Sequence, residues 1–239
     1  MRKILARKDD GEFGAIGIGA MIVFIAMILV AGIAASVLVT TSNTIQIQAL
    51  ATGQQTTKEV ASGLSVFEIA GEVNVTGGTN YDMNYTAITV KARPGSGDLD
   101  LNNTYILISD GTTKSLVRYG YANSTQIFIS KASTAGDLFG LLSGDDWDCV
   151  NREVFGIAVL QDYDSSVTEF NPVINRGDKA VIFLRCGTQP DNGSLSGIFN
   201  SEIAERTDVF GRIIPEIGAP GVISFSAPMS YVDAIYTLQ

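Results

Sequence analysis

The sequence predicts an α+β protein in which one long hydrophobic N-terminal helix precedes an all-β domain of the immunoglobulin-like sandwich type. Three observations support this fold class. No charged residue occurs from Ala15 to Thr57. Beyond Gly63, apolar and polar residues alternate with the period of two that is typical of strands. Clusters of Gly, Pro, Asn and Asp, which favour turns, separate those segments. We therefore divide the chain into a leader (residues 1–14), a helix (15–64) and a β domain (65–239).

The leader is short and densely charged, and it ends where the apolar run begins. Arg2, Lys3, Arg7 and Lys8 would hold it on the cytoplasmic side of a membrane. A conventional secretory signal would be cut behind its apolar region, but residues 15–39 exceed the usual length of such a region. A cut between Gly14 and Ala15 would instead keep the apolar helix as the N-terminus of the mature protein.

The helix has two properties that favour packing against copies of itself. At 1.5 Å per residue it would be roughly 70 Å long, about twice the hydrocarbon thickness of a bilayer. Its many Gly, Ala and Ser residues allow close approach of helix backbones where the surroundings are already apolar. A single-pass membrane anchor with no further role is the alternative. The side chains that we expect to bury against neighbouring helices are Ile16, Ile18, Ile22, Phe24, Ile25, Ile28, Leu29, Ile33 and Leu38.

The remainder of the chain reads as a series of strands. Alternating segments lie at residues 88–93, 105–109, 115–121 and 126–130. Residues 154–160, 180–186 and 222–227 are more continuously apolar, as the central strands of a two-layer sandwich would be. Turn clusters lie between the strands at residues 77–78, 94–95 and 191–193.

Asn-x-Ser/Thr motifs are more frequent than this composition would give by chance, and all lie outside the helix. Such motifs are acceptors for N-linked glycans when they face solvent in an exported protein. The candidate glycosylation sites are Asn74, Asn84, Asn102, Asn123 and Asn192.

Both cysteines, Cys149 and Cys186, fall in the β domain. A bridge between them would close a loop of about 37 residues and contribute about 3–4 kcal/mol to stability. Two buried thiols are the alternative, because Cys186 ends an apolar run.

The composition argues against catalysis. The chain contains no histidine, which excludes Ser-His and Cys-His nucleophilic catalysis and histidine-bound zinc. We therefore expect neither enzymatic activity nor a cofactor. The formal net charge of -9 opposes nucleic-acid binding. Asp145, Asp146 and Asp148 form an acidic cluster that is a weak candidate for calcium, although a solvated loop is the favoured interpretation.

Four segments resemble the archaellins, the subunits of the archaeal swimming filament. These segments are GAIGIGAMIVFIAMILVAGIAASVLV at 14–39, ATGQQTTKEVASGL at 51–64, NPVINRGDKAVIFL at 171–184 and VISFSAPMSYVDAIYTLQ at 222–239. The resemblance implies that a pilin-type signal peptidase cuts after Gly14 and that N-linked glycans are attached. It also implies a transient membrane-inserted precursor and an extracellular helical filament that is built from this chain or mixed with paralogous subunits. The filament would depend on the archaellum assembly and motor machinery.

Asp9, Asp10 and Glu12 depart from the family pattern, in which leaders often place Lys or Arg beside the cut. Two alternative functions share the leader and the helix. One is an adhesive, non-rotating pilin. The other is a membrane-anchored surface binding module or hydrolase, whose β domain would act without residues 1–60.

Overall fold

The computed structural model describes residues 10–76, 79–120, 127–130, 137–142, 147, 149–187, 197–199 and 201–239. Side chains at 10–13, 74–76 and 79–81 are outside this description, as are the turns expected at 77–78 and 191–193. The chain divides into two compact units, residues 1–55 and 56–239, which are treated separately below.

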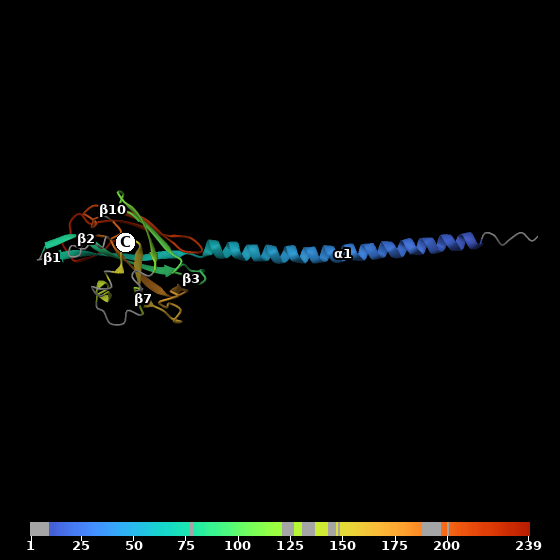
Figure 1. Ribbon diagram of the computed structural model, residues 1–239, viewed down its shortest axis with the longest axis horizontal. Helices are drawn as coiled ribbons and strands as arrows, with labels where there is room; N and C mark the ends of the chain where they lie inside the picture. The colour runs from blue at the N-terminus through green and yellow to red at the C-terminus, as the bar shows by residue number, and fades with distance from the viewer. Residues whose placement is uncertain are drawn as a thin grey trace, which may run out of the picture. The chain divides into compact units, whose positions relative to one another are not determined.

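Helix α1 spans Asp10–Ala61 (Figure 1). Its 52 residues correspond to about 78 Å at the usual helical rise. Among the described residues, Gly14–Ala61 form one helix that is long and apolar enough to cross a membrane. Thr40 and Thr41 donate their hydroxyl protons to the carbonyls of Ser36 and Val37, at 2.9 and 2.8 Å. These bonds allow polar residues to lie on an otherwise apolar helix without an unsatisfied hydroxyl.

The helix ends three residues before the predicted boundary, because Gly63 brings the chain directly against another backbone segment. A Cβ atom at Gly63, whose φ is +155°, would lie 2.5 Å from the carbonyl oxygen of Ala219. The Gly63 amide donates to Oγ of Ser96 at 2.8 Å. Leu64, which we expected at the end of the helix, is therefore the fully buried first residue of a strand.

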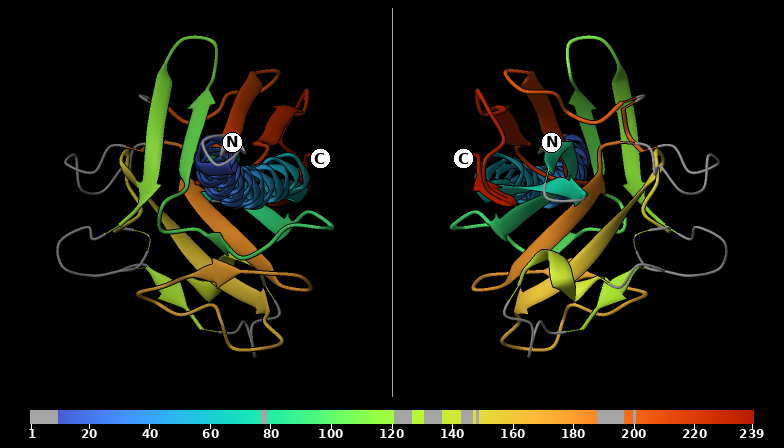
Figure 2. Two further views of the ribbon diagram at one scale, coloured as in Figure 1. Left: turned by 90° about the vertical axis from the view of Figure 1, so that its right-hand side faces the viewer. Right: turned by 90° about the vertical axis from the view of Figure 1, so that its left-hand side faces the viewer.

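The β domain consists of two layers of strands (Figure 2). The first layer contains β6 (Phe128–Ile129), β7 (Val154–Gln161), β9 (Lys179–Arg185), β2 (Thr79–Ala92), β1 (Leu64–Thr76) and β12 (Ile235–Thr237). The second layer contains β5 (Lys114–Tyr119), β4 (Tyr105–Ser109), β10 (Asp208–Ile214) and β11 (Gly221–Ser226). A short parallel pairing of β5 with β7 joins the layers. A separate small sheet pairs β3 (Leu99–Asp100) with β8 (Val173–Ile174), and a 3₁₀ helix spans Phe139–Leu141.

Both layers contribute to one hydrophobic core. Ile88 and Ile182 come from the first layer and meet Ile108 and Ile213 of the second, all within 1% of complete burial. A second cluster covers the opposite face of the first layer, where Phe183 packs with residues from 127–150. Strands β7 and β9 are therefore buried on both faces, which explains why their sequences are continuously apolar rather than alternating. The predicted fold class, a long N-terminal helix followed by an all-β domain, is confirmed.

Candidate functional site: the apolar helix and the surface of the β domain

The main candidate site is the apolar surface of α1. All nine side chains that we expected to bury against neighbouring helices are exposed here, from 54% at Ile25 and Ile28 to 72% at Leu38. A Cβ atom added at Gly17, Gly19 or Gly32 would meet nothing within 4 Å. Fully burying an aliphatic side chain of this kind is worth about 1.5–3 kcal/mol. A surface of this size is therefore stable only against lipid or other apolar side chains.

The predicted processing site lies near the beginning of this helix. Gly14 and Ala15 are both exposed, and both belong to α1. The leader residues 1–9 lie outside the described part of the chain. The cut between these two residues stays a prediction, and in the structure both residues are exposed on the helix.

Two of the five candidate glycosylation sites have described side chains, and their surroundings differ. Asn102 is exposed in the turn that follows β3, where its backbone N–H donates to Oδ1 of Asp100 at 2.7 Å. Asn84 is only 2% exposed, and its Oδ1 accepts a hydrogen bond from the Gly187 amide at 3.1 Å. The prediction of a glycan acceptor at Asn84 is therefore wrong for the folded domain, because this side chain is buried inside strand β2. The side chains of Asn74, Asn123 and Asn192 lie outside the described residues.

Cys149 and Cys186 do not form a disulfide bond. Cys186 belongs to the main core, and its Sγ lies 3.1 Å from Oγ1 of Thr86. Cys149 packs against the second cluster, on the opposite face of the first layer. The two side chains therefore lie on opposite faces of the layer, and of the two buried thiols that the alternative expected, Cys186 is buried and Cys149 is half-buried. Burial raises the pKa of the Cys186 thiol to about 12, which keeps it protonated.

The acidic cluster at Asp145, Asp146 and Asp148 lies outside the described residues. Trp147, which stands among them in the sequence, is buried against Tyr85, with ring centroids 4.1 Å apart.

A different acidic cluster, which the sequence analysis missed, forms at the two ends of the connection between β7 and β9. One carboxylate oxygen from each of Asp162, Asp164 and Asp178 lies within 4.8 Å of the others. Such oxygens are of the type that hard cations take as ligands. Hydrogen bonds from Ser166 and Asn175 lower the pKa of Asp164, which keeps this exposed group ionised. The only signal in the sequence is the spacing of Asp162 and Asp164 directly after a strand, with Asp178 directly before another.

Glu72 is a second titratable group with a changed environment. It lies on β1 between Tyr85 of β2 and Ile235 of β12. Desolvation by burial, together with the nearby negative charge of Asp137, raises its pKa from 4.5 to about 7. Glu72 therefore changes its charge close to neutral pH.

This chain combines a long helix whose apolar side chains are exposed with a two-layer β domain. That combination is typical of pilin-like filament subunits. The family model for archaeal-type flagellin matches residues 14–225, and the chain belongs to this family. It is a structural subunit of the archaeal flagellar filament, the archaellum, as the resemblance in the sequence predicted.

Three known proteins show how far the similarity extends. Flagellin B2 of Methanocaldococcus jannaschii is 40% identical over 232 residues, which cover 96% of this chain and 95% of that protein. The crystal structure of archaeal flagellin FlaB1 from the same organism superimposes with a TM-score of 0.58 at 26% identity, covering 75% of this chain and 98% of that one. The archaeal flagellum of Methanospirillum hungatei strain JF1 shares the fold, with a TM-score of 0.55 at 14% identity over 92% of this chain and 98% of that one.

Proposed function

We propose that this chain is made as a membrane-inserted precursor, is cut between Gly14 and Ala15, and then packs through α1 into the core of a swimming filament. The uncovered apolar surface of α1 is the observation that carries this proposal. Transfer from lipid to a bundle of identical helices changes apolar exposure little, so side-chain packing and release of lipid decide the balance. The apolar surface of α1 is therefore compatible first with lipid, in the precursor, and then with copies of α1, in the filament.

The position of the cut follows from the same argument. Removal of residues 1–14 would take four basic and three acidic residues away from the end of the helix. Without these charges, the end of α1 can enter an apolar filament core at a much lower desolvation cost. The match to the family model begins at residue 14, which supports this boundary.

The proposal implies several partners and no catalytic role. A prepilin-type signal peptidase would make the cut, the archaellum assembly and motor machinery would extract and turn the filament, and paralogous subunits would share it. The membrane would hold the precursor before assembly. Glycans would be attached at Asn102 and at Asn74, Asn123 and Asn192 on the displayed domain. The absence of histidine from the sequence supports a structural rather than an enzymatic role.

Mass spectrometry of the mature protein, isolated from whole cells and from sheared filaments, tests this proposal. We expect Ala15 at the N-terminus and an intact α1. Met1 would indicate a permanent membrane anchor, and Ala35 would indicate a conventional secretory signal, and either result would overturn the proposal. Swimming of cells that carry these filaments, compared with cells that lack the subunit, separates a rotating filament from an adhesive pilin.

A further inference from the structure

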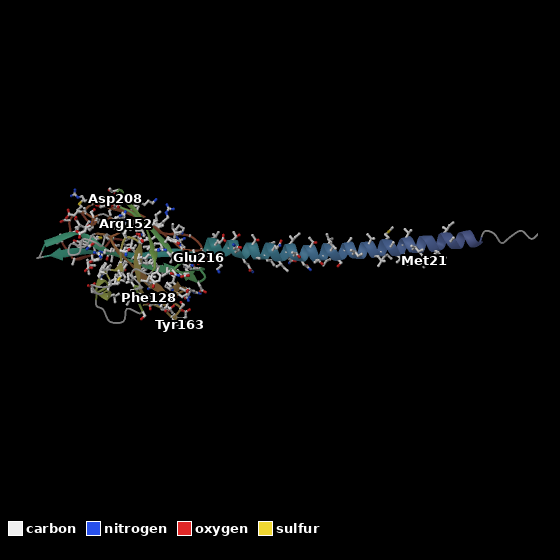
Figure 3. The ribbon with its side chains drawn as sticks, viewed as in Figure 1. Met21, Phe128, Arg152, Tyr163, Asp208 and Glu216 are labelled. Atoms are coloured by element: carbon white, nitrogen blue, oxygen red, sulfur yellow. The ribbon has the colours of Figure 1, made fainter. Side chains whose placement is uncertain are left out.

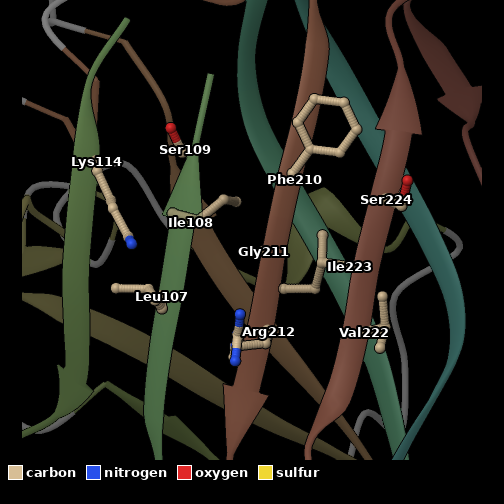
Figure 4. A pocket seen from close by; sticks show the side chains of 10 residues that line it. All are labelled: Leu107, Ile108, Ser109, Lys114, Phe210, Gly211, Arg212, Val222, Ile223 and Ser224. Atoms are coloured by element: carbon tan, nitrogen blue, oxygen red, sulfur yellow. The ribbon is translucent and has the colours of Figure 1, made fainter. Parts of the chain in front are cut away.

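The second layer of the β domain presents a face to solvent that is both apolar and basic. Inward side chains of β4, β5, β10 and β11 fill the main core, and the alternate side chains point outward. The strand registers arrange the outward side chains in four rows, two of which cross all four strands. We call this surface the outer face, and Figure 4 shows the part of it around Phe210 and Arg212. Its rows are Ser226 and Asp208; Ser224, Phe210, Ser109 and Lys114; Val222, Arg212, Leu107 and Leu116; and Ile214, Tyr105 and Arg118.

Large apolar side chains on the outer face are exposed to solvent, where a strand face usually carries polar residues. Val222, Leu116 and Phe210 are 62%, 57% and 55% exposed. Phe210 and Val222, together with Leu107, line a shallow hollow (Figure 4). Contiguous apolar patches rimmed by polar residues are typical of protein interfaces.

The charges of the outer face oppose those of the molecule as a whole. The charged residues of the four strands are Lys114, Arg118, Arg212 and Asp208, an excess of two positive charges. The full chain carries a net charge of -9. A partner of complementary charge is therefore acidic, and other copies of this chain are acidic.

A second surface of the same domain has the complementary character. Residues 162–171 form a loop after β7, which we call the aromatic loop. Tyr163 and Phe170 are 92% and 68% exposed there, beside the exposed carboxylates of Asp164 and Glu169. Figure 3 places Tyr163 at the opposite end of the β domain from Asp208 of β10, and Figure 2 shows the same separation of the loop from the β4–β5 hairpin. Tyr163 therefore lies away from the β4–β5 hairpin end of the outer face, although Glu169 of the aromatic loop contacts Tyr119 at the other end of β5.

Internal hydrogen bonds hold the aromatic loop in its conformation. Oδ1 of Asp162 accepts from the Ser165 amide at 2.8 Å, and Oδ2 accepts from the amide of the buried Val167 at 3.3 Å. The hydroxyl of Tyr119 donates to the carbonyl oxygen of Glu169 at 2.9 Å. A loop that is already ordered loses little conformational entropy on binding, and exposed Tyr and Phe side chains are common anchors of interfaces.

We propose that the aromatic loop of one subunit docks on the outer face of a neighbouring copy in the filament. Tyr163 and Phe170 fill the apolar hollow, and Glu169 pairs with Arg212, which also lines the hollow. The contact is heterologous, since it joins two different surfaces, and a heterologous contact that does not close into a ring propagates as a helix. The proposal rests on the proposed function, because only a filament brings copies together in this way. The docking would give neighbouring subunits a contact between their β domains, in addition to the contact between their α1 helices.

Disulfide cross-linking in assembled filaments tests the contact directly. Ser224→Cys or Leu116→Cys on the outer face is combined with Thr168→Cys or Asn171→Cys on the aromatic loop, in a Cys149→Ser background. After oxidation of purified filaments we expect ladders of covalent oligomers on non-reducing gels from the double variants. The single variants should remain monomeric. Dimers from Ser224→Cys or Leu116→Cys alone would show that the face pairs with itself, which would overturn the proposal.

The same experiment separates this contact from the proposed function. Normal filaments with no ladder from any of the four pairs would exclude the docking and leave the role of α1 intact. A wild-type chain that builds no filament would refute the proposed function itself.

Charge reversal gives an independent readout. Arg212→Glu and Glu169→Arg should each lower the amount of assembled filament at least about tenfold, since each places like charges in the contact. The double variant should recover to within about threefold of wild type. Arg152→Glu, an exposed site outside both surfaces, serves as the control. A double variant as defective as either single variant would contradict the pairing.

Discussion

Trp147 and Phe183 pack edge to face, with ring centroids 5.5 Å apart and ring planes at 83°. Phe183 belongs to β9, and Trp147 comes from the segment that covers the outward side of the first layer. Phe139 completes the group, 6.5 Å from Phe183. The rings of Phe139 and Trp147 cover this face of β9, so their contacts hold the segment that carries them against the first layer.

Phe183→Ala should destabilise the β domain by about 3–5 kcal/mol, because it removes a fully buried ring from between β9 and the covering segment. Val232→Ala, at a site that is 76% exposed, should change stability by less than about 0.5 kcal/mol. Urea unfolding of the detergent-solubilised chain measures both. The fluorescence of Trp147, the single tryptophan, reports the local change. Equal urea midpoints for the two variants would show that the aromatic cluster around Phe183 does not stabilise the β domain.

Glu72 should make the domain less stable as the pH rises through neutrality. Its folded pKa of about 7 lies above the ordinary value of 4.5, so the folded state binds the proton more tightly than the unfolded state. This contribution is fully present below pH 4.5 and is lost as the pH rises through 7. Glu72→Gln should flatten the dependence of the melting temperature on pH between 5 and 8.

Two controls accompany this measurement. Asp137→Asn should weaken the pH dependence in part, because the negative charge of Asp137 contributes to the raised pKa of Glu72. Glu68→Gln, on the same strand, should leave the pH dependence as in wild type. A Glu72→Gln profile that is identical to that of wild type would rule out this residue as the origin.

Asn84 and Asn102 carry the same motif and should respond in opposite ways to replacement by Gln. Asn84→Gln should cost about 1–3 kcal/mol of stability without loss of glycan mass, because the longer side chain does not fit the buried bond to Gly187. Asn102→Gln should leave stability unchanged and remove one glycan. Glycopeptide mass spectrometry and thermal unfolding make the comparison. A glycan found on Asn84 in the folded protein would contradict its burial.

Ile25→Asp should prevent filament formation. An unpaired carboxylate at the centre of an apolar helix costs about 2.5–3.5 kcal/mol in a membrane and must also be buried in every subunit of a filament. Ile25→Val keeps the apolar surface and should assemble normally. Electron microscopy of cells, with the precursor quantified in the membrane fraction, provides the measurement. Normal filaments from the Asp variant would refute the role given to the helix surface.

The sequence alone was sufficient for features that depend on local chemistry. The uncharged run from Ala15 determines a helix for an apolar environment, since residues 15–39 are almost entirely apolar and carry no charge. Alternation from Tyr105 to Ser109 reproduces the bounds of β4, because each outward residue of that strand faces solvent and each inward residue faces the core. The same local patterns carry the resemblance to the family, which the comparisons confirm.

Only the tertiary structure decided which residues meet. It buries Asn84, separates Cys149 from Cys186 by a layer of strands, and gathers Asp162, Asp164 and Asp178 from both ends of a long connection. It also aligns Phe210, Arg212 and Leu116 on one face through the registers of three strands. These placements follow from long-range strand pairing, which depends on the packing of the whole domain and leaves no periodic signal in the chain.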